Sequence, residues 1–179
     1  MPALRPFNSL LPELDERVYI DPDCSVIGDV VIGDDSSVWP GTIIRGDVNR
    51  IRIGARSNIQ DGTIIHVSHD GPNGRPVGYP TLIGDDVTIG HGAVIHACTI
   101  GDACLIGMGA IVLDGAVVEK NGFVGAGAVI PPGKTVGSGE LWLGNPAKCV
   151  RKLSAQESGQ LYYAAAHYVR LKDKYLAEA

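Results

Sequence analysis

Aliphatic residues recur every six positions along most of this chain, and this spacing dominates its hydrophobic pattern. The positions fall into four runs, namely Ile20, Val26, Ile32, Val38 and Ile44; Ile53, Ile59 and Ile65; Ile83, Ile89 and Ile95; and Ile100, Ile106, Val112, Val118, Val124, Ile130, Val136 and Trp142. A period of six fits neither the 3.6-residue repeat of an α-helix nor a simple array of hairpins. It predicts a short strand followed by a tight corner, repeated many times.

Small side chains and glycines accompany this repeat at fixed offsets. Two positions before an aliphatic residue the chain often carries Cys24, Ser36, Thr42, Thr81, Ala93, Cys98, Cys104, Ala110, Ala116 or Ala128, and directly after it Gly33, Gly54, Gly84, Gly90, Gly101, Gly107 or Gly125. We expect the aliphatic residue to point into the core, the small residue to lie where the chain bends, and glycine to supply corner backbone. Three hexads would close a triangular coil of about 18 residues, and stacked coils would pair in parallel ladders.

The tail departs from the hexad pattern. Gly144-Asn145-Pro146-Ala147 interrupts it, and Ser154 followed three residues later by Glu157 is typical of a helix N-terminus. The spacing of apolar residues then predicts an amphipathic helix over about 154–177 that packs on the outer wall. Its inward positions are expected to be Leu161, Ala165, Tyr168 and Lys172. We therefore predict one domain, 1–179, with the repeat over about 18–142.

Composition narrows the functional classes. Lysine and arginine number 15 against 20 acidic residues, and this net charge of -5 argues against nucleic acid or an anionic membrane as partner. No apolar run is long enough for a membrane-spanning helix, and residues 1–6 lack the apolar stretch of a signal peptide. The four cysteines form no CxxC pair, which indicates reduced thiols and predicts a cytoplasmic protein.

Two histidines occupy the same place in the repeat. His66 follows the inward Ile65 by one residue, and His96 follows the inward Ile95 by one. Residues 68–80 are rich in glycine and proline, and if they contain an excursion of twelve residues the two histidines are one full coil apart. Their backbones would then lie about 4.8 Å apart with both rings pointing outward, which suits two ligands of one metal ion.

A third histidine, His91, lies on the preceding face near a corner, and we do not expect it to reach that ion within the same subunit. In a three-fold trimer the corner of one subunit could meet the face of the next. The site would then have three imidazole ligands and a position open to water, as catalytic metals do. Zinc, ferrous iron and cobalt all suit such a ligand set. His69 lies in the loop, where it is either a proton carrier or solvated, and no role is expected for His167.

Several stretches make the chain similar to the γ-class carbonic anhydrases of the hexapeptide-repeat family, including the shorter bacterial members. They are Ser37-Val38-Trp39-Pro40, Arg45-Gly46-Asp47, Ser57-Asn58-Ile59-Gln60-Asp61, Ile65-His66, Thr88-Ile89-Gly90-His91, His96 and Tyr168-Val169. The resemblance implies a mainly β fold, a left-handed parallel β-helix with a C-terminal α-helix. It also implies a homotrimer with a metal ion at each interface, held by His66 and His96 of one chain and His91 of another.

The same resemblance implies reversible hydration of carbon dioxide to bicarbonate, with catalytic roles for Arg45, Asp47, Gln60, Asp61 and Tyr168. Arg45, Asp47 and Asp61 would form a charged network across the interface. Gln60 would hydrogen-bond to water on the metal, and Tyr168 would approach from the tail helix. An amide such as that of Gln60 can orient water on the metal, and Arg45 offers Asp61 a bidentate partner if that carboxylate is buried.

One departure from the family leaves other functions open. Highly active members carry glutamates beside the site that shuttle protons, whereas here Val48 follows Asp47 and residues 68–80 contain no glutamate. A metal-binding homologue with low turnover or none is therefore an alternative. A metal-dependent CoA thioesterase would use the same metal chemistry. A hexapeptide acyltransferase is a further alternative, although such an enzyme usually needs a single catalytic histidine.

Overall fold

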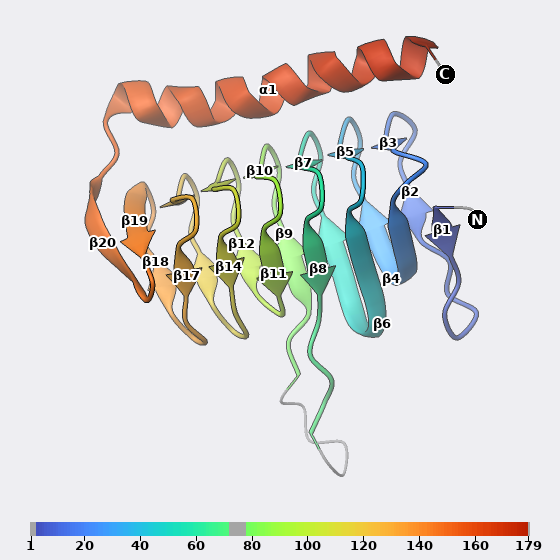
Figure 1. Cartoon of the computed structure of the whole chain (residues 1–179), viewed down its shortest axis with the longest axis horizontal. Coiled ribbons are helices and arrows are strands. Elements are labelled where there is room, and N and C mark those ends of the chain that lie inside the picture. The colour runs from blue at the N-terminus through green and yellow to red at the C-terminus, as the bar shows by residue number, and fades with distance from the viewer. Residues whose placement is uncertain (1–2, 72–77, 179) are drawn as a thin grey trace.

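Short parallel strands wind into about seven stacked coils in the computed structural model, which describes residues 3–71 and 78–178 (Figure 1). The strands form three faces. The first face comprises the N-terminal parts of β4 (Ser25–Ile32) and β6 (Ile43–Ile53), then β8 (Ile64–His66), β11 (Val94–His96), β14 (Ile111–Val112) and β17 (Val129–Ile130), with β1 (Leu4–Arg5) at its start. This arrangement is the mainly β solenoid that the six-residue period predicts.

The other two faces complete each coil. The second face comprises β2 (Glu13–Leu14), the C-terminal parts of β4 and β6, then β9 (Thr81–Ile83), β12 (Thr99–Ile100), β15 (Val117–Val118) and β18 (Thr135–Val136). The third face comprises β3 (Tyr19–Ile20), β5 (Ser37–Val38), β7 (Asn58–Ile59), β10 (Thr88–Ile89), β13 (Leu105–Ile106), β16 (Phe123–Val124) and β19 (Glu140–Gly144), and β20 (Ala147–Lys152) closes it in antiparallel pairing.

The aliphatic residues of the hexads line the core as predicted. All of them are buried except Ile20, which is partly buried. The small residues two positions earlier are buried as well, including Cys24, Cys98 and Cys104, and all four cysteines are free thiols. The predicted start of the repeat near residue 18 was too late, because β1 and β2 already pair in parallel with β4. Leu14 of β2 lies six residues before Ile20 and continues the period, whereas Leu4 of β1 lies 22 residues before its partner Val26 and is out of step with it.

Glycines serve two different purposes at the corners. A Cβ atom on Gly90 would lie 2.7 Å from the backbone nitrogen of Met108 in the next coil, so close stacking requires glycine there. Gly92 instead has a φ of +66°, with nothing within 4 Å of a Cβ atom, so the turn itself requires it. The glycine that follows an inward residue therefore serves the approach of the next coil, and a second glycine supplies the turn.

Two insertions interrupt the repeat at the edge between the first and second faces. Residues 47–50 stand opposite the single residue Asp29, because Gly28 pairs with Gly46 and Val30 pairs with Ile51. The second insertion lies between β8 and β9, where the chain leaves the coil on the side away from α1 (Figure 1). The ladder resumes in register beyond it, which confirms the twelve-residue excursion.

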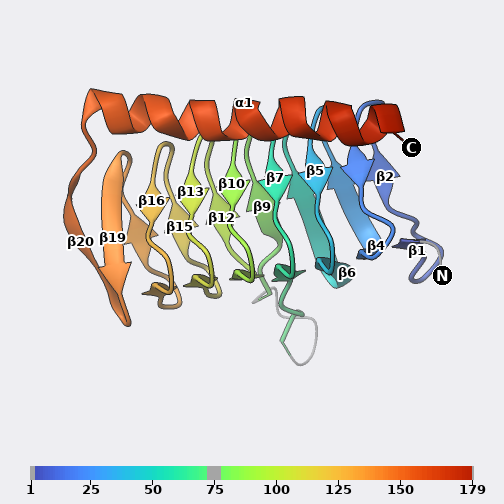
Figure 2. The same ribbon diagram turned by 45° about the horizontal axis from the view of Figure 1, so that its top comes forward.

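The C-terminal helix α1 (Ala155–Glu178) runs the length of the solenoid over the third face, so that its end returns to the first coils (Figures 1 and 2). The predicted helix, 154–177, was displaced by one residue at each end. The predicted N-terminal cap is present, because the hydroxyl of Ser154 accepts from the amide of Glu157 and the Glu157 carboxylate accepts from the amide of Ser154. No helix in the described part of the chain is long and apolar enough to cross a membrane.

A buried lysine fixes α1 to the solenoid. Leu161, Ala165 and Lys172 are the buried residues of the helix, as predicted. The Lys172 ammonium is completely buried and lies 2.8 Å from Asp35, which also pairs with Arg17. The pKa of Asp35 is held well below its usual range, mainly by the hydrogen bond from Arg17 and further by Lys172, against the opposing effect of burial.

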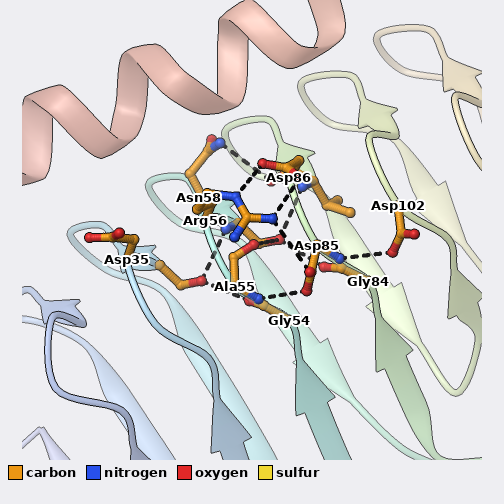
Figure 3. Close-up of polar contacts among 12 residues, drawn as sticks. Asp35, Gly54, Ala55, Arg56, Asn58, Gly84, Asp85, Asp86 and Asp102 are labelled. Carbon is orange, nitrogen blue, oxygen red and sulfur yellow. Dashed lines mark hydrogen bonds and ion pairs between the residues drawn. The ribbon is translucent and has the colours of Figure 1, made fainter.

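Asp35 lies at the edge between the second and third faces, and along this edge further ion pairs connect successive coils. Arg56 reaches across to Asp86 at 2.7 Å and to Asp85 at 3.4 Å, in the next coil (Figure 3). The carboxylate of Asp85 accepts from the amide of Ala55, and that of Asp102 accepts from the amide of Asp85. These contacts stabilise the stacking of corners that lie far from the first face.

Truncation of one inward residue tests the core. Ile100 is 1% exposed, and we expect Ile100→Ala to lower the free energy of unfolding by about 3–4 kcal/mol, because it removes buried contacts and leaves a cavity. The neighbouring Thr99 is exposed, so Thr99→Ala should change it by less than about 0.5 kcal/mol. Urea unfolding at fixed protein concentration measures both, and equal effects would contradict the inward assignment.

The helix anchor should depend on pH. Because the pKa of Asp35 is lowered in the folded state, its stabilisation is present above the ordinary carboxyl pKa of about 4 and is lost as pH falls below it. Asp35→Asn should therefore cost about 2–3 kcal/mol of unfolding free energy at pH 7, since it leaves a buried lysine with less compensation, and clearly less at pH 3. Urea unfolding at both pH values measures this, with the more exposed Asp34→Asn as control. A cost independent of pH would count against the ion pair.

Candidate metal centre

The rings of His66 and His96 lie side by side at the end of the first face. The two residues are direct partners in the parallel ladder between β8 and β11, as the register predicted. Their ring centroids are 5.3 Å apart, and Nδ1 of His66 faces Nε2 of His96 at 3.3 Å. Both rings are partly buried, so the two nitrogens point at one another from a fixed backbone.

A carboxylate holds the other nitrogen of each ring. Asp47 Oδ1 lies 2.9 Å from Nε2 of His66, and Asp114 Oδ2 lies 2.9 Å from Nδ1 of His96. A carboxylate only accepts, so in the neutral rings these nitrogens carry the protons and the two facing nitrogens carry lone pairs. Two lone pairs at this distance repel one another unless a cation lies between them.

The spacing of the facing nitrogens fits a metal ion. Two imidazole nitrogens bound to one tetrahedral zinc at about 2.0–2.1 Å lie about 3.3 Å apart, as those of His66 and His96 do. Outer carboxylates that fix ring orientation are typical of metal-ligating histidines. The residues present therefore fit a divalent metal, with two ligands from one chain.

Asp47 lies in the three-residue insertion that follows Gly46, where residues 47–50 stand opposite Asp29 alone. One of its oxygens meets His66 and the other pairs with Arg45. Burial acts to raise the pKa of the Asp47 carboxyl, but the hydrogen bonds from His66 and Arg45 outweigh it, so the pKa lies below its usual value. Within the chain, the partner of Arg45 is thus Asp47 and not Asp61.

His91 lies at the opposite edge of the first face, in the turn after β10. Its Nδ1 is 2.8 Å from Asp61 Oδ2, so a carboxylate fixes this ring too and leaves Nε2 for another partner. About half of the side chain is exposed. The turn at His91–Gly92 and the strand β11 lie between it and His96, so the two rings stand at opposite edges of the first face. Among the residues that the structure describes, no three metal-binding side chains gather at one point.

The remaining predicted residues surround His91. Gln60 is buried, and its Nε2 donates to Asn58 at 3.0 Å. A groove of about 380 Å³ extends from Gln60 and His91 to Phe123. Tyr168 is half-buried, and burial raises the pKa of its hydroxyl, with a further contribution from the negative charge of Asp61. Gln60, Asp61, His91 and Tyr168 thus form one group, and Arg45, Asp47, His66 and His96 form another across the first face.

Sequence reasoning missed Asp114. It lies 18 residues after His96, but the coil at this level has only 17 residues, because Ile95 pairs with Val112. The ladder therefore places Leu113 level with His96, and the period did not single out this carboxylate. His69 is exposed in the loop. The ring of His167 stacks on Tyr163 on the outer side of α1.

Comparison with known proteins agrees with this fold. The model of the bacterial transferase hexapeptide family (six repeats) matches residues 12–46 and 97–132. The chain is 50% identical to Protein YrdA of Escherichia coli K12 over 97% of this chain and 94% of that protein. It is 44% identical to the probable carbonic anhydrase of Methanocaldococcus jannaschii over 89% of this chain and 96% of that protein.

A solved structure titled a putative acetyltransferase, from Bacillus cereus, superposes with a TM-score of 0.91 at 35% identity and covers 98% of both chains. The fold and the repeat place this chain among the hexapeptide-repeat proteins. Within them, the chain belongs to the γ carbonic anhydrase family.

Loss of Asp114 should change the protonation of the His96 ring. In metal-free Asp114→Ala, the His96 proton should move from Nδ1 to Nε2, where it can donate to His66, and the ratio of the two forms should change roughly tenfold. Nitrogen-15 NMR of the imidazoles at pH 8.5 measures this ratio. Asp102→Ala, which removes a carboxylate distant from the histidines, is the control. An unchanged ratio in Asp114→Ala would show that the carboxylate does not set the ring.

Proposed function

We propose that this protein is a metal-dependent γ-class carbonic anhydrase that acts as a homotrimer, with zinc, ferrous iron or cobalt at each interface. His66 and His96 of one subunit and His91 of the next would be the ligands. The observation that carries the proposal is the pair of ring nitrogens facing each other at 3.3 Å, with each ring fixed by a carboxylate on its far side. A probable carbonic anhydrase among the relatives supports it.

An exposed aliphatic ladder on the first face supports the trimer. The outward residues of consecutive strands pair in register, and they are Ile43, Ile64, Val94, Ile111 and Val129. Ile43 and Ile64 are 42% and 44% exposed in the single chain, and a contiguous apolar stripe of this kind marks an interface. The ladder lies between His91 at one edge and His66 with His96 at the other. A neighbour packed against it in three-fold symmetry would complete the ligand set.

The residues around the ligands would each have a role in the hydration of carbon dioxide. The metal, when bound, supplies a nucleophile at neutral pH by lowering the pKa of water. Asn58 holds Nε2 of Gln60, which directs Oε1 away from Asn58 to accept a hydrogen bond and orient that nucleophile. Asp47 holds the guanidinium of Arg45, which remains 43% exposed and can bind the bicarbonate anion through its other N–H groups.

A second candidate is a metal-binding homologue with weak turnover. Val48 is 49% exposed beside Asp47, where highly active members of the family place a proton-shuttling glutamate. An aliphatic side chain cannot carry a proton away from the site. Stopped-flow hydration of carbon dioxide by the metal-loaded protein distinguishes the two candidates, and acyl-CoA hydrolysis on the same sample tests the thioesterase alternative.

Mixed subunits test whether the site is shared. His91→Ala and His66→Ala trimers should each lose nearly all bound Co²⁺ and nearly all carbon dioxide hydration. After unfolding and refolding together in equal amounts, about one quarter of the interfaces should combine an intact His66 with an intact His91 in a cyclic trimer. Metal analysis and stopped-flow assays should therefore recover about a quarter of the wild-type values.

The matched control is a mixture of His66→Ala with His96→Ala, which lie on the same side of every interface and should not complement one another. Recovery in this control, or none in the first mixture, would contradict the shared site. Full metal binding by His91→Ala alone would do so as well.

A further inference from the structure

Ordinary corners of the solenoid close with a backbone turn. The amide of the small residue donates to the carbonyl three residues earlier, as in Thr63 to Gln60 at 3.2 Å and Ala110 to Gly107 at 3.1 Å. This bond fixes the end of one strand relative to the start of the next. It needs three residues of spacing, so an insertion at a corner removes it.

The corner after His66 lacks this spacing. Fourteen residues, 67–80, separate His66 from Thr81, the small residue of the next hexad. Here the side chain replaces the backbone, because the hydroxyl of Thr81 donates to the carbonyl oxygen of His66 at 2.6 Å. Thr81 is completely buried, so water does not compete for this bond.

The same hydroxyl reaches the neighbouring coil. It accepts from the amide of Ala97 at 3.0 Å, and that amide also lies 3.0 Å from the carbonyl of His66. Ala97 directly follows His96. One hydroxyl therefore joins the backbone at His66 to the backbone next to His96, at the point where the chain leaves the coil.

We infer that Thr81 is a positioning residue that sets the spacing of the two facing ring nitrogens, an inference that rests on the proposed metal site. His66 is the last residue of β8, and beyond it the chain departs into the loop. Ser68 and Tyr79 pair at the base of this loop but lie one step further from the histidines. Without the Thr81 hydroxyl, the carbonyl of His66 keeps only the Ala97 amide, and the backbone that carries the ring is free to shift.

Cobalt binding tests this inference. Thr81→Val keeps the shape of the side chain and removes the hydroxyl, and we expect Co²⁺ to bind roughly tenfold more weakly, with altered visible absorption. Thr81→Ser should restore wild-type affinity. In the metal-free Thr81→Val protein, the Ala97 amide should exchange its hydrogen faster than in the wild type.

Ser36→Ala is the matched control. The buried hydroxyl of Ser36 donates to the carbonyl of Gly54 and accepts from the amide of Ser57, the same double role at a corner between the second and third faces. Its loss should lower stability and leave Co²⁺ affinity unchanged. Weaker binding in both variants would point to a general loss of stability and overturn the inference.

The outcomes separate the two proposals. Absence of Co²⁺ binding by the wild-type protein would overturn the proposed function and this inference with it. Wild-type binding together with unchanged affinity in Thr81→Val would overturn the inference alone. If Thr81→Val does not fold, NMR of the wild-type protein provides the test. A hydroxyl proton held between Thr81 and the carbonyl of His66 should give a slowly exchanging resonance. Its absence would overturn the inference.

Discussion

The inward aliphatic side chain of each hexad is the constraint on which the structure depends. The space enclosed by three faces holds one such residue per face in each coil, and each one stacks on its counterpart above and below, as Ile89 does on Ile59 and Ile106. A slip of one residue would turn the inward residue outward, so the register is strongly fixed. Neighbours of an inward residue must then stack as well, and for this reason His66 lies directly beside His96.

One of the two groups of site residues, that of His66 and His96, lies where the repeat is interrupted. Both insertions leave the coil at the edge between the first and second faces, and the ladder continues in register beyond each of them. The first insertion places Asp47 against His66, and the second starts directly after His66. Local departures from a consistent repeat are expected at functional sites. The regular coils place His66, His96 and Asp114, and the first insertion adds Asp47.

Most of what could be predicted from the sequence came from the six-residue period. It gave the coil, the pairing of His66 with His96 and the separation of His91 from them. It also continues to Leu14 of β2, six residues before Ile20, but it does not give β1 or the partner of each carboxylate. Asp61 pairs with His91 and Arg45 pairs with Asp47 within the chain. Spacing alone fixes the level of a residue along the solenoid, whereas the direction of a corner side chain depends on the local turn.

The single chain orients the rings of His66, His91 and His96 by itself. Asp47, Asp61 and Asp114 belong to the same chain as the ring that each one orients. The facing lone pairs of His66 and His96 disfavour the folded chain slightly, and a cation between them removes that cost. A ligand that binds only the folded and assembled form stabilises both states by mass action. On the proposed arrangement, metal binding and subunit association therefore strengthen one another, since neither edge of the first face holds enough ligands by itself.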